Sequence, residues 1–357
     1  MTKNFSKIKK VAVALSGGVD SSVAAALLKK QGFEVIGFHL RLFDSNQEPL
    51  NRAKKVAQKL GIDFLVLDLR KEFRENIINY FLQELKVGRT PNPCVVCNKE
   101  IKFGLMLKKA KELGCDYLAT GHYARLRSCG ASARQARLLK AKDNNKDQTY
   151  FLWKLGQKEL KKVLFPIGEI ASKAEVRELA KKFGLPTAKT PESNDICFLA
   201  NTMTSDFLRK KLGIKKGKII DVGGRVLGAH AGLWFHTIGQ RKGVGLSGGP
   251  WFVIDKDFKK NVLVVSKNEK DLLKKEIKFE QANWVSQPAK FPFRSQAKIR
   301  YGAPLANCLV YKNKAVFSKP QKAPTPGQSI VFYSPRHSSA GAKAGESVQL
   351  LGGGVII

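Results

Sequence analysis

The chain has 357 residues, of which 64 are Lys or Arg and 29 are Asp or Glu, so its formal net charge at pH 7 is +35. This length exceeds that of one hydrophobic core and predicts two or three domains. We expect no membrane span, because no run of about 18 apolar residues occurs, and no signal peptide, because the apolar run after the first lysines is short and strand-like. The charge favours a polyanionic partner, first of all a nucleic acid, with a basic proteome or a membrane surface as the alternatives.

The cysteine content points to a reducing compartment. A chain of this length with six cysteines has too few for a disulfide scaffold, and thiols in such proteins are buried, metal-bound or reactive. We therefore expect a cytoplasmic protein. The cysteines are Cys94, Cys97, Cys115, Cys129, Cys197 and Cys308.

Short apolar runs alternate with helical patterns over about the first 118 residues. This alternation predicts an α/β fold with a doubly wound parallel sheet, whose ligand binds beyond the carboxyl ends of the strands. The predicted strands are 11–15, 35–40, 64–67 and 117–120, and the predicted helices are 22–31, 51–60, 73–87 and 98–113.

The turn after the first predicted strand reads SGGVDSS, from Ser16 to Ser22. Backbone N–H groups converge there at the positive end of the following helix, which makes a phosphate cradle. The turn lacks both the Lys-Ser/Thr ending of a Walker loop and the spacing of a dinucleotide fingerprint. A serine-rich turn that caps an ordinary helix is the alternative.

Later segments change in character. Arg125–Lys142 is basic and rich in small residues and predicts a solvated loop, whereas 157–183 predicts an interrupted helical segment with a capping box at Ser172 and Glu175. From about Ile219, glycine turns separate short strands, among them 251–254, 262–266, 296–301, 306–311 and 329–333. This pattern indicates a small β-rich module followed by a β-barrel.

A second motif, TPNPCVVCNKEIKF, places Cys97 where a proline-stiffened loop enters a predicted helix. The helix dipole and the nearby Lys99 and Lys102 would favour the thiolate, and therefore nucleophilicity. A zinc half-site and a local redox pair of Cys94 with Cys97 stay open as alternatives.

Six motifs occur in the order of one known family: SGGVDSS, TPNPCVVCNKEIKF, ATGHYA, KDQTYF, ESNDICF and HTIGQRKG. On these motifs the chain resembles the tRNA-specific 2-thiouridylases, a family of ATP pyrophosphatases, over nearly its whole length. With the strand pattern, the resemblance implies an ATP pyrophosphatase domain over 1–203, a central β-rich domain over 204–272 and a C-terminal β-barrel over 273–357 that contacts tRNA.

The resemblance implies ATP-dependent thiolation of C2 of the wobble uridine in tRNA, with Mg²⁺ as a cofactor. Uridine O2 would attack the α-phosphate of ATP, and sulfur from a cysteine persulfide would then displace AMP. A second thiol would attack the persulfide. The sulfur would then pass to C2 directly, or it would be released as hydrosulfide and attack C2 itself. The target base must leave the anticodon stack, and a persulfide donor or relay protein must supply the sulfur.

The family motifs assign a role to particular residues. Cys97 would be the nucleophile and Cys197 the persulfide carrier, and the two could form a disulfide once sulfur has left. The residues implied in ATP binding are Ala14, Leu15, Ser16, Gly17, Gly18, Val19, Asp20, Ser21, Leu40 and Gly121. The residues implied in tRNA binding are Asn92, Pro93, Cys94, Lys146, Asp147, Gln148, Arg300 and Tyr301.

The chain departs from the family pattern in two places: at Cys94, and over Arg41–Asn51, which is shorter than usual and lacks a customary Cys, next to Leu40 where Met is common. Many members have Asp where this chain has Cys94, and that carboxylate is a candidate general base. With a thiol at this position, Cys94 would instead contact the target nucleobase or act as a resolving thiol. Two other functions compete with sulfur transfer. An adenylating ligase or amidotransferase would not need Cys97 and Cys197, and a non-catalytic RNA-binding protein would not need the intact SGGVDSS loop.

Overall fold

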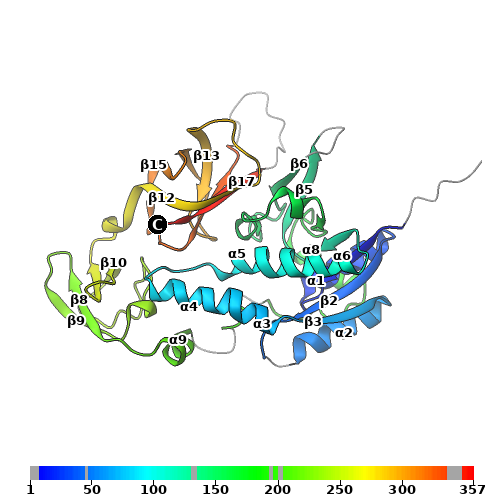
Figure 1. Ribbon diagram of the computed structural model, residues 1–357, viewed down its shortest axis with the longest axis horizontal. Coiled ribbons are helices and arrows are strands. Elements are labelled where there is room, and N and C mark those ends of the chain that lie inside the picture. Colours follow the sequence, from blue (N-terminus) through cyan, green and yellow to red (C-terminus); the bar gives the residue numbers. More distant parts are fainter. Residues whose placement is uncertain (1–7, 45–46, 130–134, 193–195, 200–203, 336–347) are drawn as a thin grey trace, which may run out of the picture. The chain divides into compact units, whose positions relative to one another are not determined.

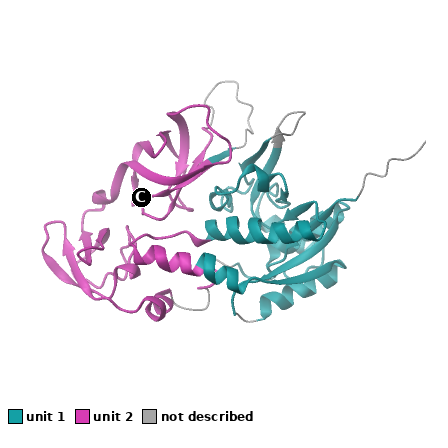
Figure 2. Ribbon diagram, viewed as in Figure 1, with its two compact units in different colours: residues 1–77, 94–194, 336–351 teal, residues 78–93, 195–335, 352–357 magenta. Residues whose placement is uncertain are grey.

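The computed structural model describes residues 8–44, 47–129, 135–192, 196–199, 204–335 and 348–357. The chain divides into two compact units, coloured separately in Figure 2. The first contains residues 1–77, 94–194 and 336–351, and the second contains residues 78–93, 195–335 and 352–357. No helix of the described ranges is long and apolar enough to cross a membrane.

A parallel sheet forms the centre of the first unit (Figure 1). Its strand order is β3-β2-β1-β4-β7, and every recorded pairing between neighbours is parallel. Because the order reverses beside β1, the crevice at the carboxyl ends of β1 and β4 is the usual ligand position of such a sheet. The predicted doubly wound fold is confirmed. The bounds are β1 (Lys10–Ala14), β2 (Glu34–Arg41), β3 (Asp63–Asp68), β4 (Tyr117–Ala119) and β7 (Val163–Leu164).

The helices of this unit pack through small and branched apolar side chains. In α1 (Val19–Lys30), Val23 and Ala24 are fully buried in the same core as Val176 and Ala180 of α8 (Lys173–Lys182). This shared core fixes the start of α8 beside α1. The remaining helices of the unit are α2 (Glu48–Leu60), α3 (Arg70–Phe73), α5 (Pro93–Cys97), the π-helix η2 (Asn98–Met106), α6 (Leu107–Glu112), the 3-10 turn η3 (Thr149–Phe151) and α7 (Gln157–Leu160), and the π-helix η1 (Arg74–Ile78) leads to the unit boundary.

Two sequence predictions in this unit were wrong. Most of Arg125–Lys142, predicted to be a solvated loop, forms the antiparallel hairpin β5 (Ala124–Cys129) and β6 (Gln135–Lys140). Alternate residues at the start of β6 are buried, Leu138 completely, but the arginines of the hairpin hide this alternation in the sequence. Arg125 is itself buried, and its Nε donates a hydrogen bond to the carbonyl of Lys140 at 2.6 Å. Within the predicted helical stretch, β7 instead extends the sheet, since Val163 is buried beside β4.

The second unit contains two β structures. The four-stranded sheet has the order β10-β11-β8-β9, and the six strands that follow form a closed barrel in the order β12-β15-β14-β13-β16-β17, so the predicted β-rich module and barrel are confirmed. The bounds are β8 (Gly217–Asp221), β9 (Val226–His230), β10 (Phe252–Asp257), β11 (Val262–Ser266), β12 (Leu273–Trp284), β13 (Phe293–Lys298), β14 (Ala306–Val310), β15 (Lys314–Lys322), β16 (Ser329–Tyr333) and β17 (Leu350–Ile356). Two 3-10 turns, η4 (Leu233–Phe235) and η5 (Glu269–Leu272), connect these strands.

Aromatic side chains fill the barrel. Trp284 stacks on Phe332 with ring centroids 5.5 Å apart, and Phe279 lies 5.2 Å from the same ring.

Two helices accompany the two β structures. These helices, α4 (Asn79–Lys86) and α9 (Thr204–Leu212), share a small apolar core through Phe81 and Leu208. The boundaries 1–203, 204–272 and 273–357 stay a prediction.

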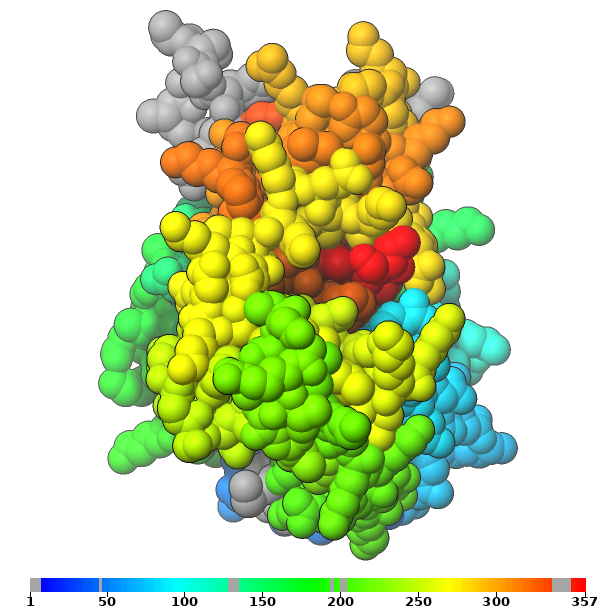
Figure 3. Space-filling model, turned by 90° about the vertical axis from the view of Figure 1, so that its left-hand side faces the viewer, coloured from blue at the N-terminus to red at the C-terminus, as the bar shows by residue number. Residues whose placement is uncertain are grey.

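A hollow of about 370 Å³ opens in the second unit (Figure 3). The C-terminal Ile356 and Ile357 and the loop at Pro324 line it together with β10 and β12. Lys256 also lines it and donates a hydrogen bond to the carbonyl of His236 at 3.0 Å. Burial lowers the pKa of Lys256 to about 8.

Candidate functional site

The loop after β1 has the backbone of a phosphate cradle. Gly17 has a φ of +80°, and a Cβ there would lie 2.3 Å from the carbonyl oxygen of Pro49, so only glycine fits. Gly18 caps α1 without any side-chain hydrogen bond, which leaves the first N–H groups of the helix for an acceptor from outside. Ser21 and Ser22 donate their hydroxyls to the Gly18 carbonyl at 3.1 and 2.8 Å. These serines therefore hold the shape of the loop.

The neighbouring strands narrow the cradle. Gly121, two residues after β4, approaches the start of α1 so closely that a Cβ would lie 2.7 Å from the nitrogen of Ser21. In β2, His39 bonds through Nδ1 to the carbonyl of Leu15 at 2.8 Å, and burial lowers its pKa, so the ring is neutral. Leu40 follows and is half-buried. The structure thus brings Leu15, Gly121 and Leu40 to the same edge of the sheet.

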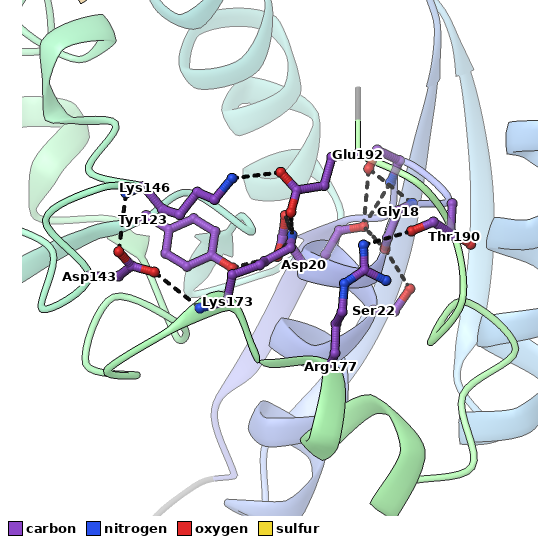
Figure 4. A network of polar contacts seen from close by, with 12 residues as sticks. Gly18, Asp20, Ser22, Tyr123, Asp143, Lys146, Lys173, Arg177, Thr190 and Glu192 are labelled. Atoms are coloured by element: carbon purple, nitrogen blue, oxygen red, sulfur yellow. Dashed lines mark hydrogen bonds and ion pairs between the residues drawn. The ribbon is translucent and has the colours of Figure 1, made fainter. Parts of the chain in front are cut away.

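A network of charged side chains adjoins the cradle (Figure 4). Asp20 accepts hydrogen bonds from the Tyr123 hydroxyl at 2.8 Å and from Lys173 Nζ at 2.6 and 2.7 Å. Burial and the charge of Asp20 raise the pKa of Tyr123 far above its usual value, so this hydroxyl stays protonated and donates. Asp20 is therefore held from two sides.

Glu192 extends the network away from the cradle. Its carboxylate pairs with Lys146 Nζ at 2.7 Å and lies 3.9 Å from Lys173 Nζ, and the hydrogen bond from Lys146 lowers the pKa of Glu192. Arg177 instead donates to the carbonyls of Ala188 and Thr190 at 2.8 and 3.1 Å, so it holds the backbone that leads to Glu192.

The first thiol of the site is protonated. Cys97 is the last residue of α5 rather than the first residue of a helix, and only 7% of its surface is exposed. Burial raises its pKa to about 11 and outweighs the opposing charge of Lys102. Lys99 pairs with Glu159 at 2.7 Å. The expectation of a stabilised thiolate was wrong for this structure, because desolvation disfavours the charged form.

The other cysteine positions differ in exposure. Cys94 is half-buried, and burial also raises its pKa, whereas Cys197 is exposed and belongs to the second unit. Of the two residues before Cys94, Pro93 is buried and Asn92 is half-buried. No group of three or more His, Cys, Asp or Glu residues that could hold a metal ion occurs among the residues with described positions.

The predicted tRNA-binding residues divide into accessible and internal ones. Arg300 and Tyr301 are exposed, and they lie in the turn after β13 rather than in the predicted strand 296–301. Asp147 is only 2% exposed and accepts from the Thr149 hydroxyl and from the nitrogen of Ala141. The Asp147 carboxylate therefore faces the interior, and a tRNA contact at this residue stays a prediction.

Lys146 and Gln148 flank that buried carboxylate. Lys146 carries the ion pair with Glu192, while the Gln148 side chain accepts from the backbone nitrogen of Tyr123 at 3.0 Å. Both side chains are partly exposed. Lys146 is thus part of the network of Figure 4, and Gln148 contacts the backbone of Tyr123, another member of that network.

Sequence reasoning missed Lys173 and the role of Tyr123. Tyr123 belongs to the ATGHYA motif, so its position was marked although its contact was not. Lys173 is separated from Asp20 by 153 positions, and no local pattern connects them. One signal was available in the sequence: Lys173 is the first residue of a helix, where the helix dipole favours an acidic side chain, so a lysine there indicates a partner elsewhere.

In the second unit, the segment before Asn92 is held by the barrel loop. The nitrogen of Thr90 donates to the carbonyl of Pro326 at 2.7 Å, and Gln328 Nε2 donates to the carbonyl of Thr90 at 2.8 Å. Arg89 pairs with Glu280 at 2.9 Å and with Glu84 at 3.0 Å. The sequence segments RTP and PTPGQ, far apart in the chain, are therefore neighbours.

Three family models match successive parts of the chain. A tRNA methyl transferase HUP domain matches residues 9–201, a tRNA methyl transferase PRC-barrel domain matches 205–267, and an aminomethyltransferase beta-barrel domain matches 274–356.

Curated relatives match nearly the whole length. The tRNA-specific 2-thiouridylase MnmA of Alkaliphilus oremlandii is 43% identical over 347 residues, covering 92% of this chain and 94% of that protein. The protein of the same name from Streptococcus pyogenes serotype M1 is 41% identical over 377 residues, covering 100% of this chain and 96% of the relative. A solved 4-thiouridine synthetase–RNA complex with bound ATP is 19% identical, covers 54% of this chain and 45% of that chain, and has a TM-score of 0.37. A similarity of this size carries no argument about function.

Proposed function

From the premise that this chain belongs to the tRNA-specific 2-thiouridylase family, we propose that it is a tRNA sulfurtransferase that replaces O2 of the wobble uridine by sulfur at the expense of ATP. The observation that carries the proposal is the cradle between β1 and β4. At both Gly17 and Gly121 a Cβ atom would clash with neighbouring backbone atoms, so only glycine lets the loops approach as they do. Methyl transfer, the activity in the descriptions of two matching models, has no need of an ATP cradle.

The first step is adenylation. Uridine O2 attacks the α-phosphate of ATP, the bond to the β-phosphate breaks, and pyrophosphate leaves. The N–H groups of Gly18, Val19 and Asp20 stabilise the negative charge on the phosphates. Ala14, Leu15, Ser16, Gly17 and Ser21 shape the loop, and Leu40 packs against the adenine.

The carboxylates of Asp20 and Glu192 lie 2.6 and 3.9 Å from Lys173 Nζ, and they are hard oxygen ligands of the kind with which Mg²⁺ binds substrate phosphates. When bound, this ion would neutralise phosphate charge.

The second step transfers sulfur. Cys97 attacks the inner sulfur of a Cys197 persulfide, a Cys97–Cys197 disulfide forms, and the outer sulfur leaves as hydrosulfide or passes directly to C2, with loss of AMP. The two thiols are oxidised and the sulfane sulfur is reduced, so electrons balance. Because the pKa of Cys97 is about 11, a base or a change of surroundings must remove its proton first.

The remaining assignments follow the family motifs. Asn92, Pro93 and Cys94 contact the flipped base, and the tRNA is contacted by Lys146, Asp147, Gln148, Arg300 and Tyr301. A persulfide donor or relay protein charges Cys197, the enzyme acts in the cytoplasm, and 1–203, 204–272 and 273–357 are its domains.

Nucleoside mass spectrometry tests this function. Unmodified tRNA is incubated with ATP, Mg²⁺ and a persulfide donor, and with the wild type, Cys97→Ser or Cys197→Ser. We expect 2-thiouridine with the wild type and none with either variant, whereas free sulfide, which needs no persulfide, should bypass both thiols alike. Cys115→Ala is the matched control, since this buried thiol lies outside the motifs. ATP consumption without sulfur in the tRNA, or a methylated uridine, would overturn the proposal.

A further inference from the structure

Lys173 occupies an electrostatically unfavourable place. It is the first residue of α8, where the partial positive charge of the helix end favours an acidic side chain. Its side chain leaves this helix end and meets both carboxylate oxygens of Asp20, at 2.6 and 2.7 Å. A residue that opposes its local environment and pairs far away in the sequence is a candidate for function.

The position of Lys173 is fixed by its surroundings. Ser172 caps α8 by accepting from the nitrogen of Glu175 at 3.2 Å, and the nitrogen of Lys173 donates to Asp143 at 3.0 Å. Further along α8, Val176 is fully buried against the core that contains α1. The ammonium is therefore held at the first turn of α1, the turn whose N–H groups form the cradle.

The ammonium is also nearly removed from water. Only 13% of the Lys173 side chain is exposed, and its charge lies 5.7 Å from the centre of the Tyr123 ring. A buried charge without a partner is costly, so Lys173 needs an anion in every state of the site. Asp20 supplies that anion in this structure (Figure 4).

We propose that Lys173 is a phosphate-binding residue of the nucleotide site, and that Asp20 holds its ammonium until a nucleotide enters. The inference rests on the proposed function, because it takes the cradle to be an ATP site. The SGGVDSS loop has no lysine of its own, unlike a Walker loop. Lys173 of α8, 153 positions after Asp20 in the chain, supplies the missing positive charge.

The other cations of Figure 4 are committed elsewhere. Arg177 donates to two backbone carbonyls, and Lys146 pairs with Glu192 at 2.7 Å. Among the labelled residues of Figure 4, three carboxylates (Asp20, Asp143 and Glu192) balance three cations (Lys146, Lys173 and Arg177), so a triphosphate brings excess negative charge. A phosphate oxygen offers Lys173 a replacement for Asp20, while the Tyr123 hydroxyl still donates to the released carboxylate.

Isothermal titration of the full chain with ATP and with adenosine tests the inference. Lys173→Gln should weaken ATP binding by about 10- to 100-fold, the usual size of a lost hydrogen bond between charged groups, and should change adenosine binding by less than about twofold. Lys173→Arg keeps the charge and should recover part of the affinity. Lys181→Gln removes a charge from the same helix, where Lys181 pairs with Glu178 on the surface, and should change neither value.

A purely structural role gives a different result. If Lys173 only neutralises Asp20, then Asp20→Asn combined with Lys173→Gln should have the melting temperature of the wild type and should bind ATP as tightly as Asp20→Asn alone. We expect the double variant to recover the melting temperature and to bind ATP more weakly than Asp20→Asn alone. Equal losses for ATP and adenosine, or an unchanged ATP affinity in Lys173→Gln, would overturn the inference.

Failure of the inference is separable from failure of the proposed function. Wild type that binds ATP and forms 2-thiouridine, together with a Lys173→Gln variant of normal ATP affinity, removes the inference alone. Wild type that does not bind ATP removes both.

Discussion

The backbone of Gly121 lies against the first turn of α1, so that a Cβ atom on Gly121 would be 2.7 Å from the nitrogen of Ser21 and 2.8 Å from the carbonyl carbon of Asp20. Both neighbours are backbone atoms, which cannot rotate away as a side chain can. The loop after β4 and the cradle after β1 therefore depend on each other's position.

Gly121→Ala should consequently move the cradle. We expect a loss of about 1–3 kcal/mol in the free energy of unfolding, as for other insertions into a packed site, and ATP binding at least about tenfold weaker. Thermal unfolding and titration with ATP measure the two effects. Gly302→Ala is the control, since nothing lies within 4 Å of a Cβ at that position. Normal ATP affinity in Gly121→Ala would contradict the assignment of this glycine to the site.

The pKa of about 11 predicts how Cys97 reacts. Because only the thiolate is nucleophilic, alkylation of Cys97 by iodoacetamide should be slow at pH 7 and rise about tenfold per pH unit up to about pH 10. The exposed Cys197 should be labelled first at pH 7. Peptide mass spectrometry of the alkylated protein gives both rates. A Cys97 rate that levels off near pH 8 would mean that burial does not control this thiol.

Arg300 should contribute one contact to the tRNA backbone. It is exposed, next to Tyr301, in the turn after β13. Arg300→Ala should lower tRNA affinity and reduce the slope of log affinity against log salt by about one. Arg300→Lys keeps the charge and should keep the slope. Filter binding at several salt concentrations measures it, and an unchanged slope in Arg300→Ala would remove this residue from the interface.

Lys256 makes stability depend on pH. Its pKa is about 8 in the folded protein and 10.5 ordinarily, because burial disfavours the ammonium. Between pH 8 and 10.5 the unfolded chain binds more protons, so the fold becomes more stable as pH rises through this range, and the cost of the buried charge is fully present below pH 8.

Replacement of Lys256 reveals this dependence. Lys256→Met removes the burial of charge and also the hydrogen bond to His236, so we expect it to be about 1–2 kcal/mol more stable than the wild type at pH 7. The difference should shrink towards pH 10.5. Denaturant unfolding at pH 7 and pH 10 tests the sign, and a variant that is less stable at both values would show that the hydrogen bond dominates.

Some parts of the fold were predictable because their cause is local. The run before Ser16 is uniformly apolar, as a strand buried on both faces must be, and Gly17, which follows, has a positive φ that other residues rarely adopt. The hairpin of β5 and β6 was missed for the opposite reason. Arg125 is buried there by a bond to the carbonyl of Lys140, and composition alone assigns arginine to the surface.

The sequence by itself determined the alternation of strands and helices over about the first 118 residues, the cradle loop and the cysteines of the two motifs, since turn geometry and hydrophobic periodicity act over a few residues. Only the tertiary structure decided that Cys97 is a protonated thiol, that the Asp147 carboxylate faces the interior, and that Lys173 meets Asp20. Protonation and ion pairing depend on which groups exclude water and which charges come close. The residues that supply them here lie up to 153 positions apart in the chain, and only packing brings them together.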